Sequence, residues 1–366
     1  MTTRLNTEIS LSEPGDVLAA LPHMLGFHPT NSFVLLTLHD LTSTPKFGAS
    51  MRMDLPCPSQ ICLFGEHLLH GPLSRQRAEG VIMVVVGNQP NYEGCPESCS
   101  GKCHESDETG SDCGPPMFDL VDVVRKTLFQ AGIVTAHALH VPQVAVGEPW
   151  QCYYDESCRG VVADPKESPM GAVMAAEGSV TFGSKEELRE LVAPESEAVV
   201  NRWSAKLDAL TEETIDSYDP SRVTEDVRKV FGAIQRIAAG SALTEDDLLG
   251  VLQAVADIRV RDIVMGTALS ELARPAEELW LTLVRKAPEP ELVEVAALLA
   301  FSAYVRGEGA LAGVALERIE HAKPGHNLGA LMRQAMDAGI PPAELAVIAR
   351  HSADDVQLLL DEDGAC

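Results

Sequence analysis

The residues most able to do chemistry are the cysteines, and four of them fall close together beside a histidine. One short segment holds Cys95, Cys99, Cys103 and Cys113, with His104 among them. Thiolate and imidazole are ligands that zinc prefers, and a short loop can bring four ligands to one tetrahedral ion only when they are this dense. We therefore expect the four cysteines to bind zinc, with His104 as the substitute for a thiol that points away.

The segment from 87 to 116 that carries these cysteines is long for a loop inside a compact domain. Its cysteine spacing matches neither the usual zinc knuckles nor the ferredoxin patterns. Two alternatives therefore stay open, a mobile acidic loop with free thiols and a redox-sensing or disulfide role. If zinc binds, we expect a structural site, because a full set of protein ligands leaves no position for water or substrate.

Two weaker candidates could line a cleft. Cys152 and Cys158 make a site too small for zinc unless a histidine or the first loop joins them, so packing of two thiols is the favoured interpretation. His28 lies with Asn31 and Ser32 where a helix gives way to a strand, a position from which side chains often reach a cleft at a sheet edge. The alternative is that His28 only donates a hydrogen bond to a loop carbonyl.

Motifs of the common enzyme classes do not occur in the sequence. It has no phosphate-binding loop, no dinucleotide-type glycine fingerprint, no zinc-protease helix motif and no nucleophile elbow. Carboxylates are abundant, but with 54 acidic against 28 basic residues a carboxylate pair is typical of a solvated face. The sequence therefore names no catalytic residue, and zinc is the one cofactor we expect.

Charge and hydropathy limit the partners. A net charge of −26 repels phosphates and anionic lipid, so we expect no nucleic-acid partner. No apolar run approaches the roughly 18 residues of a membrane span, and residues 1–10 lack the apolar core of a signal peptide, so we expect no membrane partner. The expected location is the cytoplasm, where cysteines are thiols or metal ligands more often than disulfides.

The elements that must position these residues change in kind along the chain. The N-terminal part alternates helix and strand patterns, including period-two alternation over residues 47–55 and an apolar run over residues 81–86. Further helices are predicted over residues 12–25 and 118–131, and strands over residues 32–38 and 133–141. These patterns predict an α/β domain over residues 1–193, a mixed sheet with helices on its faces.

Helical patterns alone fill the remainder, so we expect an all-α domain over residues 194–366. Between residues 280 and 342, small residues, a glycine turn and a later proline are typical of a tetratricopeptide-like hairpin. In that interpretation Gly307 and Gly309 allow two helices to cross closely. The alternative is an ordinary helical hairpin in a bundle, because one unit is too few for a stacked array.

Several motifs resemble those of one family, the actinobacterial domain-of-unknown-function family 4192. They are Ser-Glu-Pro-Gly-Asp-Val-Leu at 12–18, Leu-Gly-Phe-His-Pro at 25–29, Arg-Met-Asp-Leu-Pro at 52–56, Trp150 with Cys152 and Cys158-Arg159-Gly160, and Tyr-Val-Arg-Gly-Glu-Gly-Ala-Leu-Ala at 304–312. The resemblance implies a cytoplasmic protein and brings no activity, cofactor or catalytic residue. Members usually carry two adjacent cysteines where this chain has Cys158-Arg159, and the segment from Cys95 to Cys113 has the character of an insertion.

These observations favour a non-enzymatic adaptor or regulatory protein that acts through protein–protein contacts. The reasons are the repeat-like hairpin and the lack of catalytic motifs. The alternative is a zinc-dependent enzyme, or a thiol or metal sensor, with its site near the Cys-rich loop.

Overall fold

The structure is a computed structural model that describes residues 13–89, 114–176, 178–213 and 220–350. The chain divides into two compact units, residues 1–185 with 337–339 and residues 186–336 with 340–366. The separate folding of residues 1–193 and 194–366 stays a prediction. Cys95, Cys99, Cys103, His104 and Cys113 lie outside the described residues.

The first unit is built on a mixed sheet, as its sequence predicts. Among the described residues the sheet has the strand order β2-β1-β3-β4-β5-β6. The parallel pair is β3 with β4, and the other neighbours are antiparallel. The strands are β1 (Ser32–His39), β2 (Lys46–Asp54), β3 (Gly80–Val86), β4 (Val134–Val141), β5 (Pro149–Cys152) and β6 (Arg159–Val161).

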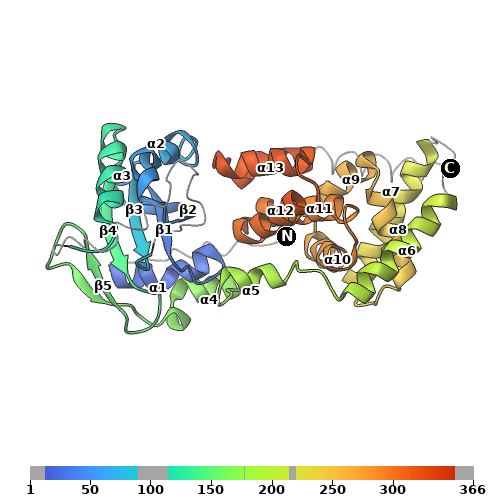
Figure 1. The fold of residues 1–366 in the computed structure, drawn as a ribbon, viewed down its shortest axis with the longest axis horizontal. Helices are drawn as coiled ribbons and strands as arrows, with labels where there is room; N and C mark the ends of the chain where they lie inside the picture. The colour runs from blue at the N-terminus through green and yellow to red at the C-terminus, as the bar shows by residue number, and fades with distance from the viewer. Residues whose placement is uncertain (1–12, 90–113, 177, 214–219, 351–366) are drawn as a thin grey trace. The chain divides into compact units, whose positions relative to one another are not determined.

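Helices cover both faces of this sheet (Figure 1), because β3 is buried on both sides and therefore needs an apolar layer on each. On one face lies α1 (Pro14–Leu25), with α4 (Pro169–Ala176) packed against α1. On the other face lie α2 (Ile61–His70) and α3 (Phe118–Gln130). The short 3-10 turns η1 (Pro58–Gln60) and η4 (Pro165–Glu167) connect these elements.

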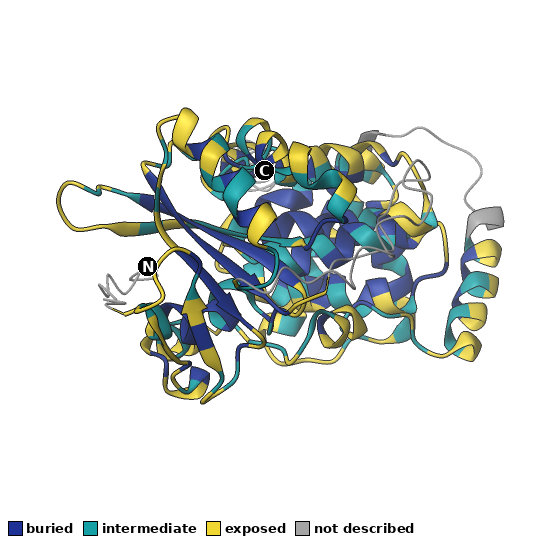
Figure 2. Cartoon of the chain, turned by 60° about the vertical axis from the view of Figure 1, so that its left-hand side comes forward, coloured by how far each residue is buried: buried dark blue, intermediate teal, exposed yellow. Residues whose placement is uncertain are grey.

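The second unit is helical, as predicted. Its central helix is α11, in which every residue from Leu292 to Tyr304 except Glu294 is buried. Figure 2 shows such buried helices in dark blue, with exposed faces in yellow. The helices are α5 (Lys185–Glu190), α6 (Glu197–Glu213), α7 (Pro220–Ala238), α8 (Glu245–Val255), α9 (Ile258–Val264), η5 (Met265–Leu269), α10 (Ala273–Lys286), α11 (Leu292–Arg306), α12 (Gly309–Ala322) and α13 (Asn327–Asp337).

The corner between α11 and α12 corrects one detail of the predicted hairpin. Gly307 ends α11 with a left-handed φ of 93°, which glycine adopts without strain. A Cβ added to Gly309 would meet no described atom within 4 Å. The predicted close helix crossing at Gly309 is therefore wrong, because no described residue approaches the position that its side chain would take. The tetratricopeptide-like character of the hairpin stays a prediction.

Within the described ranges, no helix has both the length and the apolar character needed to cross a membrane.

Candidate functional site

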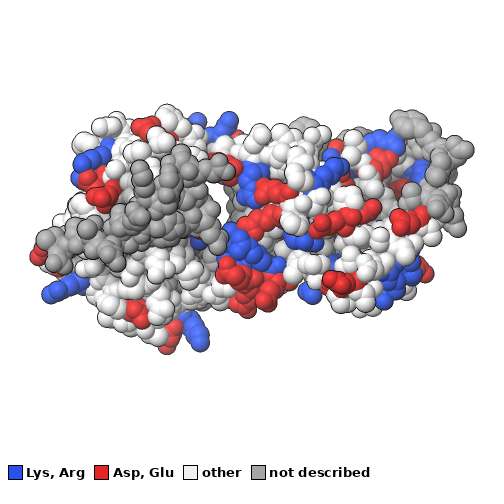
Figure 3. Space-filling view, viewed as in Figure 1, with Lys and Arg blue, Asp and Glu red and all other residues white. Residues whose placement is uncertain are grey.

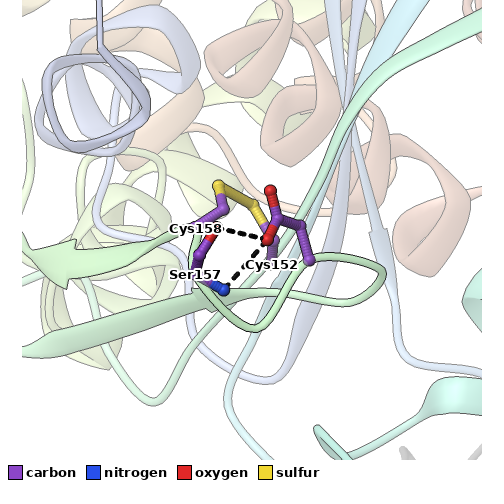
Figure 4. Close-up of a disulfide and its surroundings, with 4 residues drawn as sticks. Cys152, Ser157 and Cys158 are labelled. Atoms are coloured by element: carbon purple, nitrogen blue, oxygen red, sulfur yellow. Dashed lines mark hydrogen bonds between the residues drawn. A yellow bond between two sulfur atoms is a disulfide. The ribbon is translucent and has the colours of Figure 1, made fainter.

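A disulfide joins Cys152, the last residue of β5, to Cys158, which directly precedes β6 (Figure 4). The two strands pair antiparallel, and the backbone amide of Cys152 donates to the carbonyl of Cys158 at 2.8 Å. This pairing sets the Cα atoms 5.4 Å apart, inside the usual range for a disulfide. The expectation of packed free thiols is therefore wrong for this pair, because the hairpin that brings the cysteines together was not visible in the sequence pattern.

The tight turn between the two cysteines is held by Asp155. Its Oδ1 accepts hydrogen bonds from the amide of Ser157 at 2.9 Å and from the hydroxyl of Ser157 at 2.6 Å (Figure 4). The amide of Cys158 donates to the backbone carbonyl of Asp155 at 3.0 Å. The hydrogen bond from the Ser157 hydroxyl is the main cause that lowers the pKa of the Asp155 carboxyl. The turn therefore presents Cys158 in a fixed place.

His137 on β4 is the third member of this group. In the antiparallel pairing of β4 with β5, Leu139 lies opposite Cys152. Side chains alternate along a strand, so His137 points to the same face as Leu139, the face that α1 covers. A ring nitrogen of His137 and the sulfurs of Cys152 and Cys158 all lie within 4.8 Å of one another. The histidine is exposed and the cysteines are half-buried, so solvent reaches the group.

The indole of Trp150 packs in the same core cluster as the cysteine pair and lies close to two glycines. A Cβ on Gly160 would stand 2.9 Å from Cζ2 of the indole, and one on Gly15 would stand 3.3 Å from its Nε1. Both distances are tighter than ordinary contact, so a side chain at Gly160 would force the ring to shift and one at Gly15 would crowd it more mildly. The indole joins the core cluster against which Cys152 and Cys158 pack. The motif residues at 15, 150 and 160 thus have a common structural role, to hold the β5–β6 hairpin on α1.

The opposite face of the sheet carries a second polar group, centred on His140. This imidazole is buried, and its Nε2 donates to Oδ1 of Asn88 at 2.9 Å and contacts the carbonyl of Gly87 at 3.3 Å. Burial lowers the pKa of His140, against a smaller opposing effect of the Gly87 hydrogen bond. Tyr153 packs edge-on to His140, and its hydroxyl donates to the carbonyl of Pro116. These contacts anchor the two ends of the segment 87–116.

His28, Asn31 and Ser32 have structural partners. The Nδ1 of His28 donates to the carbonyl of Val144 at 3.3 Å, the alternative role considered for it. Asn31 has a left-handed φ of 42°, and Ser32 is buried with its hydroxyl donating to the Thr30 carbonyl at 2.7 Å. Among the described residues, no hydrogen bond or disulfide joins these three to Cys152 or Cys158. Only the cysteine pair of the candidate cleft is therefore brought together.

Sequence reasoning missed His137. Its strand was predicted over residues 133–141, and period two along that strand gives the face of the side chain. The missing information is the register, since nothing local says that β5 pairs with β4 so that Cys152 falls opposite Leu139.

The comparisons with known proteins give one result. A family model described as "Domain of unknown function (DUF4192)" matches residues 14–343. The chain belongs to this family. No curated protein and no solved structure matches the chain. The DUF4192 match begins at the helix that holds Gly15 and covers the disulfide hairpin and the helical corner at Gly307.

The helical part of this DUF4192 chain holds a buried polar network. Arg261 donates to Glu294 at 2.7 Å, and Nε2 of His326 donates to the other oxygen of Glu294 at 3.1 Å. Nδ1 of His326 accepts from the amide of Gly329 at 3.2 Å, so both ring nitrogens have partners. A cavity of about 230 Å³ adjoins His326 between the end of α12 and the start of α13. The network leaves no described polar atom of His326 for a ligand, so its role is structural.

Ion pairs also cover the surface of this unit. Figure 3 shows acidic and basic side chains side by side on the helical part. Arg202 and Lys206 of α6 pair with Glu245 of α8, each at 2.8 Å. Such interspersed pairs are typical of a solvated face.

Proposed function

We propose that this DUF4192 protein is a regulatory protein whose cysteine pair, Cys152 and Cys158, is oxidised or reduced with the surrounding thiol redox state. The change alters a surface to which a protein partner binds. The observation that carries the proposal is the disulfide across the β5–β6 hairpin. Its cysteines are half-buried, and β6 is the last strand of the described sheet. All three residues of β6 are exposed. Solvent-accessible disulfides are the ones that thiols reduce most readily.

The exchange reaction needs an external thiol, for which glutathione is the natural class of reductant in a cytoplasm. A thiolate attacks one sulfur of the pair, and the other cysteine leaves as a thiolate, which takes up a proton. A second glutathione attacks the mixed disulfide, so that two glutathione thiols become one glutathione disulfide and the protein gains two thiols. Two electrons and two protons pass to the protein, and the reverse sequence restores the disulfide.

Reduction would loosen the hairpin rather than unfold it. The disulfide closes a short ring of backbone between residues 152 and 158. Breaking it stabilises the locally opened hairpin by about 2 kcal/mol relative to the closed one, because the opened chain is no longer restricted by the cross-link. Neither the hydrogen bond from the Cys152 amide to the Cys158 carbonyl nor the packing of Trp150 needs the S–S bond, so the reduced hairpin should still form but open more often. The change should therefore be confined to β6 and its hairpin, the last strand of the described sheet, and an edge strand is a place where a protein partner can add a strand.

The helical region from 194 to 366 is the natural second contact for a partner, as in an adaptor. A zinc-dependent enzyme, the alternative that the sequence left open, has less support. His140 and His326, two buried histidines, both have partners within the protein.

Hydrogen exchange of the oxidised and the reduced protein tests the proposal. The amide of Cys152, and those of Gly147 and Val162, which bond across the same hairpin, should exchange faster after reduction, by up to about 30-fold for 2 kcal/mol. Amides of β1 and β3 at the centre of the sheet are the internal control and should not change. Equal exchange at Cys152 in both states would sink the proposal, because reduction of the pair would then not change the stability of the hairpin.

A further inference from the structure

His137, Cys152 and Cys158 form a group of three metal-ligand side chains. Within the part of the chain that the structure describes, these are the only histidine, cysteine or carboxylate side chains gathered this closely in a set of three. We propose that the reduced pair, together with His137, binds one zinc ion. The proposal rests on the proposed function, since it needs the dithiol form of the switch.

The donor set suits zinc. Two thiolates and one imidazole are borderline-soft ligands that a tetrahedral zinc ion accepts. With Zn–S bonds of about 2.3 Å, two sulfurs on one tetrahedral ion lie about 3.8 Å apart. The Cα atoms of Cys152 and Cys158 are 5.4 Å apart, so the sulfurs can separate to that distance by side-chain rotation once the disulfide is broken.

The three ligands come from elements that are already fixed. His137 lies on β4, Cys152 ends β5, and Cys158 follows the turn that Asp155 and Ser157 hold. The pairing of β4 with β5 sets the histidine and the first cysteine on one face without a need for zinc. A site on preformed strands requires little ordering when the ion binds, which favours affinity.

The fourth position of the ion would be open to solvent. His137 is exposed, and among the described residues no fourth histidine, cysteine or carboxylate joins the group. Water is the natural fourth ligand. Three protein ligands hold zinc less tightly than four, so the metal can leave when the pair is oxidised.

Zinc and the disulfide exclude one another, because the same two sulfurs form either bond. Zinc therefore stabilises the reduced state and makes oxidation harder. At free zinc 100 times its Kd, the equilibrium constant for disulfide formation falls about 100-fold. Oxidation in turn releases the ion with the loss of two thiolate bonds. The ratio of disulfide to dithiol would thus depend on both the free zinc concentration and the thiol redox state.

The test must remove the other cluster of possible ligands. A background chain with Cys95, Cys99, Cys103 and Cys113 changed to Ser and His104 changed to Ala leaves the proposed site as the main thiol site. The metal-free, reduced protein is titrated with zinc against a chromophoric chelator. We expect one equivalent in the reduced protein and none in the oxidised one. Reduced protein that binds no more zinc than oxidised protein would overturn the site.

Variants of the three ligands test which side chains bind the ion. His137→Ala should weaken zinc binding by at least about 10-fold, because one of three ligands is lost. Cys152→Ser/Cys158→Ser should abolish the thiolate-to-metal absorption of the cobalt(II) form, because it removes both thiolates of the site. The matched control is His70→Ala, another exposed histidine of the same unit, which should bind as the background does. An unchanged affinity in His137→Ala would also overturn the site.

A background chain that folds poorly does not end the test. In the otherwise unaltered chain, the difference in zinc bound between wild type and Cys152→Ser/Cys158→Ser gives the same quantity, with one equivalent expected and none overturning the site. The two proposals fail separately. If glutathione cycles the pair but reduced protein binds no zinc, the switch stands and the zinc site falls. If zinc binds but glutathione disulfide cannot oxidise the reduced pair, the zinc site stands and the switch falls.

Discussion

Gly160 lies against the indole of Trp150 so closely that a Cβ on Gly160 would stand 2.9 Å from the ring carbon Cζ2. The same ring also lies close to Gly15 of α1. The tryptophan is thus fixed by two glycines that are far apart in the sequence. Its position determines where the β5–β6 hairpin, with Cys152 and Cys158, lies on the sheet.

The first prediction concerns this contact. Gly160→Ala should destabilise the hairpin by about 1–3 kcal/mol, because the added methyl group must push a packed ring aside. Gly15→Ala should cost less, since its Cβ would stand 3.3 Å from the ring nitrogen. Hydrogen exchange of residues 149–161 measures both effects locally. Gly309→Ala, where no described atom lies within 4 Å, is the control and should leave exchange in its own helix unchanged or slower. Equal exchange in Gly160→Ala and wild type would contradict the role of the tryptophan contact.

The second prediction concerns Glu294. Burial acts to raise the pKa of its carboxyl, but hydrogen bonds from His326 and Arg261 outweigh burial and lower the pKa. A lowered pKa contributes stability that is present above the ordinary value of about 4.3 and is lost as pH falls through the lowered value. Glu294→Gln should therefore lower the melting temperature at neutral pH, and its difference from wild type should shrink below about pH 4. A difference that stays constant down to pH 3 would rule out this linkage.

The third prediction concerns Glu277, whose pKa shifts the other way. Burial raises the pKa of Glu277, and the hydrogen bond from Arg306 only partly offsets burial. Arg306→Met should cost about 3 kcal/mol at neutral pH, because it leaves a buried carboxylate without its cation. The cost should fall as pH is lowered toward the ordinary glutamate pKa, since protonation removes the unpaired charge.

Thermal unfolding at neutral and acidic pH measures the effect of Arg306→Met. Arg202→Met is the control, because Arg202 pairs at the exposed surface and its loss should change the melting temperature little at any pH. A larger loss of stability at acidic than at neutral pH in Arg306→Met would contradict the argument.

The fourth prediction concerns the Cys-rich segment, which lies outside the described residues. Cys95, Cys99, Cys103 and Cys113 are expected to bind one zinc ion, and chelation should release it with the four thiols becoming titratable. Elemental analysis of tag-free protein measures the metal, and the Cys152→Ser/Cys158→Ser variant isolates this cluster from the hairpin site. A variant without metal, in which alkylation and peptide mapping find Cys95, Cys99, Cys103 and Cys113 all freely reactive, would leave the segment as an acidic insertion.

The sequence predicts those parts of the fold that local signals determine. Gly26 takes the left-handed conformation that ends α1, and Thr244 with Asp247 forms a full capping box at α8, both as their residue types indicate. The parts it does not predict depend on pairing between distant segments. The strands β5 and β6 are too short to show a period, so the hairpin was missed. The place of His137 beside the cysteines follows from strand register alone.

The central claim is that Cys152 and Cys158 exchange between disulfide and dithiol. The direct measurement is equilibration of the whole protein in glutathione buffers of graded ratio, followed by alkylation and mass analysis of the peptide with both cysteines. We predict a smooth two-electron transition, with the pair oxidised at the oxidising end and reduced at the reducing end, at a potential within the range that glutathione can buffer. A pair that stays wholly oxidised or wholly reduced across the whole series would contradict the account.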